Sequence, residues 1–262
     1  MSEYLYGANT AEEVINGGRR RIFRVLVARS ARDTDRGHGR PVPAARGQGK
    51  GAAAADLARK KGIRVEFVDN RVLEKYAPGA NHQGIVLEVE PLRHYSSAEA
   101  LELEKDPKRF LWAGVDGVTD PMNLGAILRS AACFGVSSVL LPERRTVGIT
   151  PTVQKTSSGA LEKLNIVPVG NLNSTIIDLK ERGVWVYGLD MAGEPLDKVD
   201  YAFPGLILVG SEGDGLHLKT KEHCDRLLSI PQLGGVESLN ASAAAAVAFY
   251  EVSKKLRASR GK

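Results

Sequence analysis

The chain has 262 residues, 43% of them hydrophobic and 26% charged, which is typical of a globular protein with one or two domains. No apolar run approaches the ~18 residues of a membrane span, and two cysteines are too few for a disulfide framework. The net charge of +5 is uneven, because residues 1–64 carry +8 and the remainder −3. A basic N-terminal part predicts a module that binds a polyanion, although a solvated basic surface explains the same charge.

The first part of the chain, residues 1–91, predicts a small α/β domain. Apolar periodicity indicates short helices and strands in alternation. The predicted strands are 23–28, 62–69 and 84–92, and the predicted helices are 10–18, 52–61 and 70–77. Residues 30–52 are rich in glycine, proline and arginine and predict a mobile basic insert.

The insert contains glycines that fit a dinucleotide-binding pattern. Gly47, Gly49 and Ala52 match G-x-G-x-x-A, and Asp69 follows at about the expected distance. The pattern needs a buried strand directly before the glycines, and the stretch there has prolines and no apolar run. We therefore reject a dinucleotide site.

Residues 92–108 are polar and predict a linker with one helical turn, and residues 109–262 predict a second, larger α/β domain. Its predicted strands are 110–115, 137–141, 164–168, 184–189, 205–210 and 227–230, and its predicted helices are 123–134, 172–182 and 240–256, with a shorter one between 151 and 160. Alternating strands and helices predict a largely parallel sheet covered on both faces. Ligands of such sheets bind beyond the carboxyl ends of the strands.

One loop at such an end is "DGVTDPMNLGAILRSAACFG", residues 116–135. It places Asn123 where a helix N-cap is expected, and Gly135 where the helix ends. Arg129 falls about 200° around the helix from the apolar Ile127, on the far side. A capping asparagine and a surface arginine explain this loop when it is taken alone.

Two further loops have the same position. "LILVGSEGDGL", residues 206–216, is a buried-type strand followed by glycines around Glu212, which allow close approach of the backbone to a ligand or form a plain turn. "SIPQLGGVESLNASAAAAVAFYE", residues 229–251, places Glu237, Ser238 and Asn240 before an alanine-rich helix. Ser238 and Asn240 are candidate caps, and the exposed amides there suit an anionic or polar group.

Together these three stretches resemble the motifs of the SpoU (TrmH-like) branch of the SPOUT RNA methyltransferases. The resemblance covers residues 109–257. It implies a parallel sheet whose C-terminal segments form a deep trefoil knot, an exception to the rule against knots. The segment "NHQGIVLEVEPL", residues 81–92, and the elements before it resemble the L30e-like, RNA-selecting domain of the family's 23S rRNA guanosine-2′-O-methyltransferases. The basic insert and Gln232 depart from the family pattern.

The resemblance also implies a cofactor, S-adenosylmethionine, held by backbone groups of Gly210, Ile230 and Leu239, with no metal. Relatives are homodimers with the catalytic pocket at the interface. Arg129 is implied to act on the ribose hydroxyl, either as a base or as a phosphate clamp, since a guanidinium gives up its proton reluctantly. The implied positioning residues are Asn123, Glu212, Ser238 and Asn240.

We therefore expect an RNA 2′-O-methyltransferase acting on a guanosine of large-subunit rRNA. A tRNA, or an rRNA adenosine whose methylation confers antibiotic resistance, is an alternative substrate. A non-catalytic RNA-binding or ribosome assembly factor is an alternative of another class. The absence of a signal peptide in the sequence leads us to expect the bacterial cytoplasm, with the mitochondrial matrix as the alternative.

Overall fold

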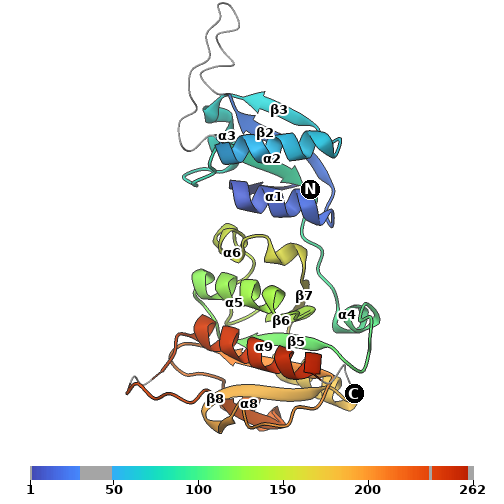
Figure 1. Cartoon of the computed structure of the whole chain (residues 1–262), viewed down its shortest axis with the longest axis vertical. Helices are drawn as coiled ribbons and strands as arrows, with labels where there is room; N and C mark the ends of the chain where they lie inside the picture. The colour runs from blue at the N-terminus through green and yellow to red at the C-terminus, as the bar shows by residue number, and fades with distance from the viewer. Residues whose placement is uncertain (1, 30–48, 236–237, 259–262) are drawn as a thin grey trace, which may run out of the picture. The chain divides into compact units, whose positions relative to one another are not determined.

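The computed structural model describes residues 2–29, 49–235 and 238–258, and the chain forms two compact units, Met1–Leu92 and Arg93–Lys262 (Figure 1). Most of the predicted basic insert, and Glu237, lie outside the described residues. The segment predicted as a linker folds with the second unit, because Tyr95 N donates to Ile166 O at 3.0 Å and Trp112 Nε1 donates to Glu104 Oε1 at 2.6 Å.

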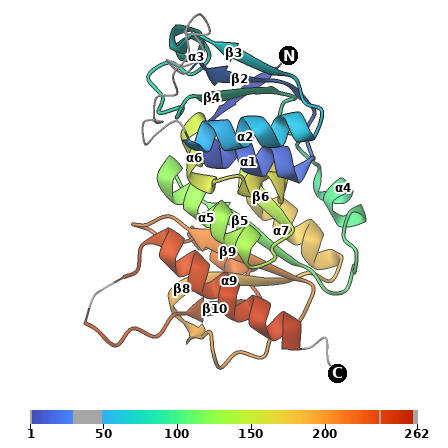
Figure 2. The ribbon, with the colours of Figure 1, turned by 45° about the horizontal axis from the view of Figure 1, so that its top comes forward.

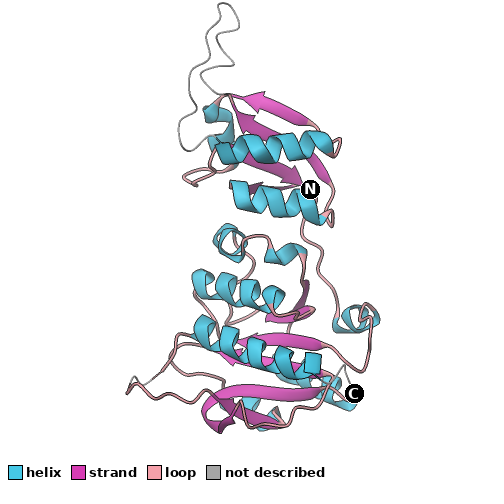
Figure 3. Ribbon diagram, in the orientation of Figure 1, coloured by secondary structure: helices cyan, strands magenta, loops and turns pink. Residues whose placement is uncertain are grey.

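The first unit is a mixed four-stranded sheet with helices on both faces (Figure 3). The strand order is β1-β4-β2-β3, in which β4 pairs antiparallel with β1 and β2, and β3 pairs parallel with β2. Its elements are β1 (Glu3–Tyr6), α1 (Ala8–Gly17), β2 (Ile22–Ala28), α2 (Gly49–Lys60), β3 (Val65–Val68), α3 (Asn70–Tyr76) and β4 (Ile85–Val89).

The apolar positions of the first unit divide between two small cores. One core joins α1 and α2 to one face of the sheet through residues such as Val14, Ala55 and Leu87. The other lies under α3, around Leu26 and Leu73. Each of α1 and α2 buries one stripe of small and branched side chains in this core, so both helices cover the same face of the sheet.

The second unit is a six-stranded sheet in which every strand pair is parallel, as predicted. The order is β10-β8-β9-β5-β6-β7. Its elements are α4 (Ser97–Glu102), β5 (Leu111–Asp116), α5 (Pro121–Cys133), β6 (Ser138–Pro142), α6 (Pro151–Ser157), η1 (Ala160–Glu162), β7 (Asn165–Val169), α7 (Leu172–Glu181), β8 (Trp185–Pro195), β9 (Gly205–Gly210), α8 (Leu218–His223), β10 (Arg226–Ser229) and α9 (Ala241–Ala258).

Helices cover both faces of this sheet, which explains why its strands read as continuous apolar runs. The helices α5 and α9 lie side by side over one face, with α6 beside α5 (Figure 2). The other face carries α7, whose Ile176 and Leu179 pack in one core with Trp112 and Leu206. The fold is the predicted parallel α/β arrangement, whereas the trefoil knot remains a prediction of the family resemblance.

Strand β8 is longer than predicted because β10 pairs with it in two registers. Leu227 pairs with Gly188, but the next residue, Leu228, pairs with Glu194. The intervening residues 189–193 therefore leave the ladder. This bulge lies at the carboxyl edge of the sheet, where the predicted site is expected.

Candidate functional site

The ends of β5, β9 and β10 lie at the same edge of the sheet because the strands are parallel. A pocket of about 410 Å³ opens beside the end of β9, a size that suits a small-molecule ligand. The three residues predicted to hold the cofactor line it: Gly210, Ile230 and Leu239. Glu212 and Ser238 line it too, as do Leu189, Asp190, Met191, Val209, Ser211, Gly213, Asp214, Gly215, Lys221, Leu228, Gln232, Ala241 and Ala244.

Asn240, in the third predicted motif, is hydrogen-bonded to a residue of each of the other two motifs. Its Oδ1 accepts from the backbone N–H groups of Ser242 and Ala243, so it caps α9. Its Nδ2 donates to Asn123 Oδ1 at 2.9 Å and to Glu212 Oε1. The side chains of three segments distant in the sequence thus meet, and one of them, Glu212, lines the pocket.

The prediction that Asn123 caps α5 is wrong. Asp120 is the cap, because its carboxylate accepts from Met122 N at 3.0 Å and Asn123 N at 3.2 Å, with Pro121 as the first helical residue. Asn123 is therefore inside the first turn and buried, and its side chain is free to accept from Asn240. On α9, Asn240 is a cap, as predicted, whereas the capping role of Ser238 stays a prediction.

Arg129 does not take part in the hydrogen bonds of this cluster. It is exposed on α5, six residues after Asn123, which turns it about 120° around the helix. Among the residues that the structure describes, it forms no hydrogen bond or ion pair. In the described part of one chain, therefore, no hydrogen bond or ion pair joins Arg129 to Asn123, Glu212 or Asn240.

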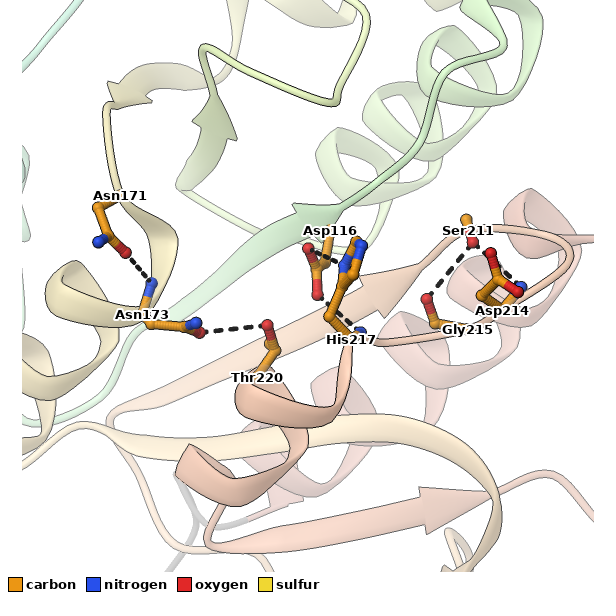
Figure 4. Close-up of polar contacts among 8 residues, drawn as sticks. All are labelled: Asp116, Asn171, Asn173, Ser211, Asp214, Gly215, His217 and Thr220. Carbon is orange, nitrogen blue, oxygen red and sulfur yellow. Dashed lines mark hydrogen bonds and ion pairs between the residues drawn. The ribbon is translucent and has the colours of Figure 1, made fainter.

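The loop between β9 and α8 is fixed at both ends by polar contacts (Figure 4). Ser211 and Gly215 exchange backbone hydrogen bonds at 3.0 and 3.2 Å, which closes a tight turn around Glu212. After the turn, the buried Asp116 carboxylate accepts from the backbone N–H of His217 at 3.0 Å and lies 2.8 Å from its Nδ1. The end of β5 thereby holds the loop that presents Glu212.

Gly210, at the start of this loop, has no room for a side chain. A Cβ there would lie 2.0 Å from the carbonyl carbon of Gly215. The close approach of the two backbone segments explains why glycine is required. It also keeps the Gly210 peptide at the wall of the pocket, as expected for a backbone contact with a ligand.

Sequence reasoning missed one charged pair in the pocket. Asp190, in the β8 bulge, lies 2.5 Å from Lys221 Nζ of α8. The hydrogen bond from Lys221 lowers the pKa of the Asp190 carboxyl below its usual value, so the group is ionised. Asp190 directly follows the strand predicted over 184–189. The rule that ligands bind at carboxyl ends could therefore have identified it from sequence.

The pocket fits a nucleoside sulfonium such as S-adenosylmethionine in three ways. Leu189, Val209 and Leu228 provide an apolar wall for a base, and Glu212 and Asp214 provide acidic groups for a cation. The glycine-bearing turn allows close backbone contact. No group of three or more His, Cys, Asp or Glu side chains within residues 2–29, 49–235 and 238–258 could hold a metal ion. In the same ranges, no helix has the length and apolar character needed to cross a bilayer.

Two protein families match the chain. The SpoU rRNA methylase family matches residues 111–250, which contain all the residues that line the pocket. A second family, described as RNA 2′-O ribose methyltransferase substrate binding, matches residues 44–95. The methylase match lies within the second unit, and the substrate-binding match lies in the first unit except for its last three residues.

Several known proteins are similar to this chain over most of its length. A putative TrmH family tRNA/rRNA methyltransferase of Bacillus subtilis is 35% identical over 97% of this chain and 96% of its own length. The 23S rRNA (guanosine-2′-O-)-methyltransferase of Xylella fastidiosa strain 9a5c is 41% identical over 74% of this chain and 79% of its own. An uncharacterized tRNA/rRNA methyltransferase of Synechocystis is 42% identical over 74% of this chain, but this chain spans only 51% of that protein.

Solved structures show the same fold. The SpoU methyltransferase AviRb from Streptomyces viridochromogenes, in complex with AdoMet, has a TM-score of 0.74 at 21% identity and covers all of this chain and 92% of its own. An AdoMet-bound rRNA methyltransferase from Sinorhizobium meliloti has a TM-score of 0.72 at 22% identity over 97% of this chain and 87% of its own. The family match over more than half of the sequence, with a relative 35% identical over nearly all of it, shows that this chain belongs to the SpoU family of S-adenosylmethionine-dependent RNA methyltransferases.

Proposed function

We propose that this protein methylates the ribose 2′-hydroxyl of a guanosine in large-subunit rRNA, and that it acts as a homodimer. The main observation that supports this proposal is that one side chain, Asn240, bridges Asn123 and Glu212 beside the cofactor pocket. The 23S rRNA guanosine specificity named for the Xylella relative supports the substrate, as does the substrate-binding match to residues 44–95.

The chemistry needs a hydroxyl that is held in line and polarised. When bound, S-adenosylmethionine supplies a methyl group on a sulfonium, which is already a good leaving group. The ribose hydroxyl is a weak nucleophile until a protein group orients it or accepts its proton. Glu212 and the Asn123–Asn240 amide pair place fixed acceptors and donors beside the pocket, where they would orient the ribose and Arg129.

Arg129 completes the site from the second protomer in our proposal. Its side of α5 faces away from Asn123, and it has no described partner in its own chain. The neighbouring helix α9 exposes Val247 and Tyr250 at 41% and 50%, an apolar surface suited to a partner subunit. A guanidinium brought across that surface would bind an RNA phosphate and stabilise the developing charge on the ribose oxygen.

Mixing two inactive variants tests the shared site. Arg129→Ala and Glu212→Gln are each expected to abolish methyl transfer, and Arg129→Ala is expected to leave the affinity for S-adenosylmethionine nearly unchanged. In a mixed dimer, a site shared between subunits would leave one of the two pockets intact. Co-expression of the variants should therefore restore about a quarter of the wild-type activity on rRNA.

The alternative outcomes are distinct. If each site is built within one chain, the mixture stays inactive. If Arg129→Ala weakens cofactor binding as much as it weakens methyl transfer, its assignment to the RNA side is wrong. Because the Bacillus relative is named as a tRNA/rRNA methyltransferase, a tRNA transcript is offered beside the 23S rRNA transcript. Preferential labelling of the tRNA would contradict the proposed substrate, and RNA binding without label transfer would favour a non-catalytic factor.

A further inference from the structure

We propose that Asp190, held in place by Lys221, is the acceptor for the ribose hydroxyls of the nucleoside half of the cofactor. The inference rests on the proposed function, since it takes the pocket as the S-adenosylmethionine site. It assigns a specific role to a side chain that the loop motifs do not include.

The position of Asp190 follows from the break in the β8–β10 ladder. β10 pairs with Gly188 and then with Glu194, so residues 189–193 bulge away from the strand. Gly193 allows this bulge to return close to β10, because a Cβ there would lie 2.5 Å from the carbonyl carbon of Leu227. Asp190 and its neighbour Met191 line the pocket as a result.

The Asp190 carboxylate is oriented and still has unused capacity. One oxygen, Oδ1, accepts from Ala192 N at 2.9 Å, and the other, Oδ2, lies 2.5 Å from Lys221 Nζ. The side chain is only 14% exposed. A carboxylate has about four acceptor positions, so each oxygen keeps room for one more donor. Two adjacent acceptors match two adjacent hydroxyl groups.

The net charge of the Asp190–Lys221 pair indicates which hydrogen-bond donor of the cofactor binds there: the ribose hydroxyls or the charged amino group. Lys221 neutralises Asp190 at contact distance, and its ammonium would repel a sulfonium or an amino group placed on the same carboxylate. A ribose diol donates two hydrogen bonds without a charge. The neutralised carboxylate therefore suits the diol.

The turn after β9 gives the pocket acidic groups of a different character. Glu212 and Asp214, in the turn after β9, line the pocket and form no ion pair with any residue in the described part of the chain. These unneutralised carboxylates suit the cationic half of the ligand. Apolar Leu189, Val209 and Leu228 also line the pocket, and they suit the base. The pocket thus offers a neutralised carboxylate for the diol and unneutralised carboxylates for the cationic half.

A cycle of protein and ligand changes tests the contact directly. S-adenosylhomocysteine and its 2′,3′-dideoxy analogue are titrated calorimetrically into the wild-type protein and into Asp190→Ala. On wild type, removing the hydroxyls should weaken binding by about tenfold or more, as expected for hydrogen bonds to a charged group. Asp190→Ala should weaken S-adenosylhomocysteine by a similar factor, and the dideoxy analogue should lose little or nothing further on this variant.

The proposal would be overturned if the two changes weakened binding independently, so that their fold-losses in affinity multiplied. Such a result would show that Asp190 and the hydroxyls do not touch. Asp190→Asn, which keeps the shape of the side chain, repeats the cycle if the alanine variant unfolds. Glu194→Ala removes another acid–base pair on β8, with Arg226, and should change neither affinity. Failure of wild-type protein to bind S-adenosylhomocysteine at all would instead overturn the cofactor site itself, and this inference with it.

Discussion

The requirement for glycine at position 210 gives the sharpest test of how the pocket is built. In Gly210→Ala, the new Cβ would lie 2.0 Å from the carbonyl carbon of Gly215 and 2.3 Å from both its oxygen and Leu216 N. An ordinary contact of about 3.4 Å therefore requires the two backbone segments to separate by more than 1 Å. Neither segment is a flexible side chain that could move aside.

The turn cannot move freely, because the hydrogen bonds between Ser211 and Gly215 and the contact of His217 with Asp116 hold it. Overpacking of this kind costs about 1–3 kcal/mol. For a domain of this size, that corresponds to a fall in Tm of about 2–4 °C per kcal/mol. A misplacement of about 1 Å in an active site can also lower the catalytic rate by about a hundredfold.

Thermal unfolding and calorimetric titration of S-adenosylhomocysteine measure both effects. We expect Gly210→Ala to lower Tm and to weaken binding strongly. The matched control is Gly213→Ala in the same turn, where a Cβ meets nothing within 4 Å and Tm should be unchanged. Wild-type affinity and Tm in Gly210→Ala would refute the close approach of the two backbone segments.

Three further expectations concern stability and reactivity. Asn240→Ala removes the cap of α9 and leaves the buried Asn123 without its donor, so the free energy of unfolding in urea should fall by about 2 kcal/mol or more, and an unchanged value would contradict the bridge. Asp120→Ala should cost about 1 kcal/mol in the same assay, whereas Asp120→Asn should retain most of the stability because asparagine caps as well; equal losses would exclude the cap. Burial raises the pKa of the Cys224 thiol to about 12, so at pH 8 it is protonated and iodoacetamide should modify the exposed Cys133 first, as read by peptide mass spectrometry; equal rates would contradict the burial.

Much of the second unit was predictable because its strands are buried on both faces. Each strand is a short apolar run, and runs such as residues 205–210 coincide with the observed β9. β1 was not predicted, since its four residues are defined mainly by their pairing with β4. The six-residue α8 was missed for a related reason, because it follows a loop that long-range contacts hold.

The site was predictable in its parts and not in its connections. The position of Gly210 and Glu212 after a strand follows from local pattern, and the structure places both at the pocket. The hydrogen bond from Asn240 to Asn123 joins residues 117 positions apart, and no local pattern records it. The capping role of Asp120 was overlooked because proline at the first helical position moves the cap to the residue before it.

The proposed reaction is methyl transfer from S-adenosylmethionine in the pocket to a ribose oxygen of rRNA. The direct measurement is incubation with methyl-labelled S-adenosylmethionine and a 23S rRNA transcript, followed by digestion to nucleosides. We expect label in 2′-O-methylguanosine, and we expect it to depend on Arg129 and Glu212. Label on a base, label in a different nucleoside, or no transfer by protein that binds both cofactor and RNA would contradict it.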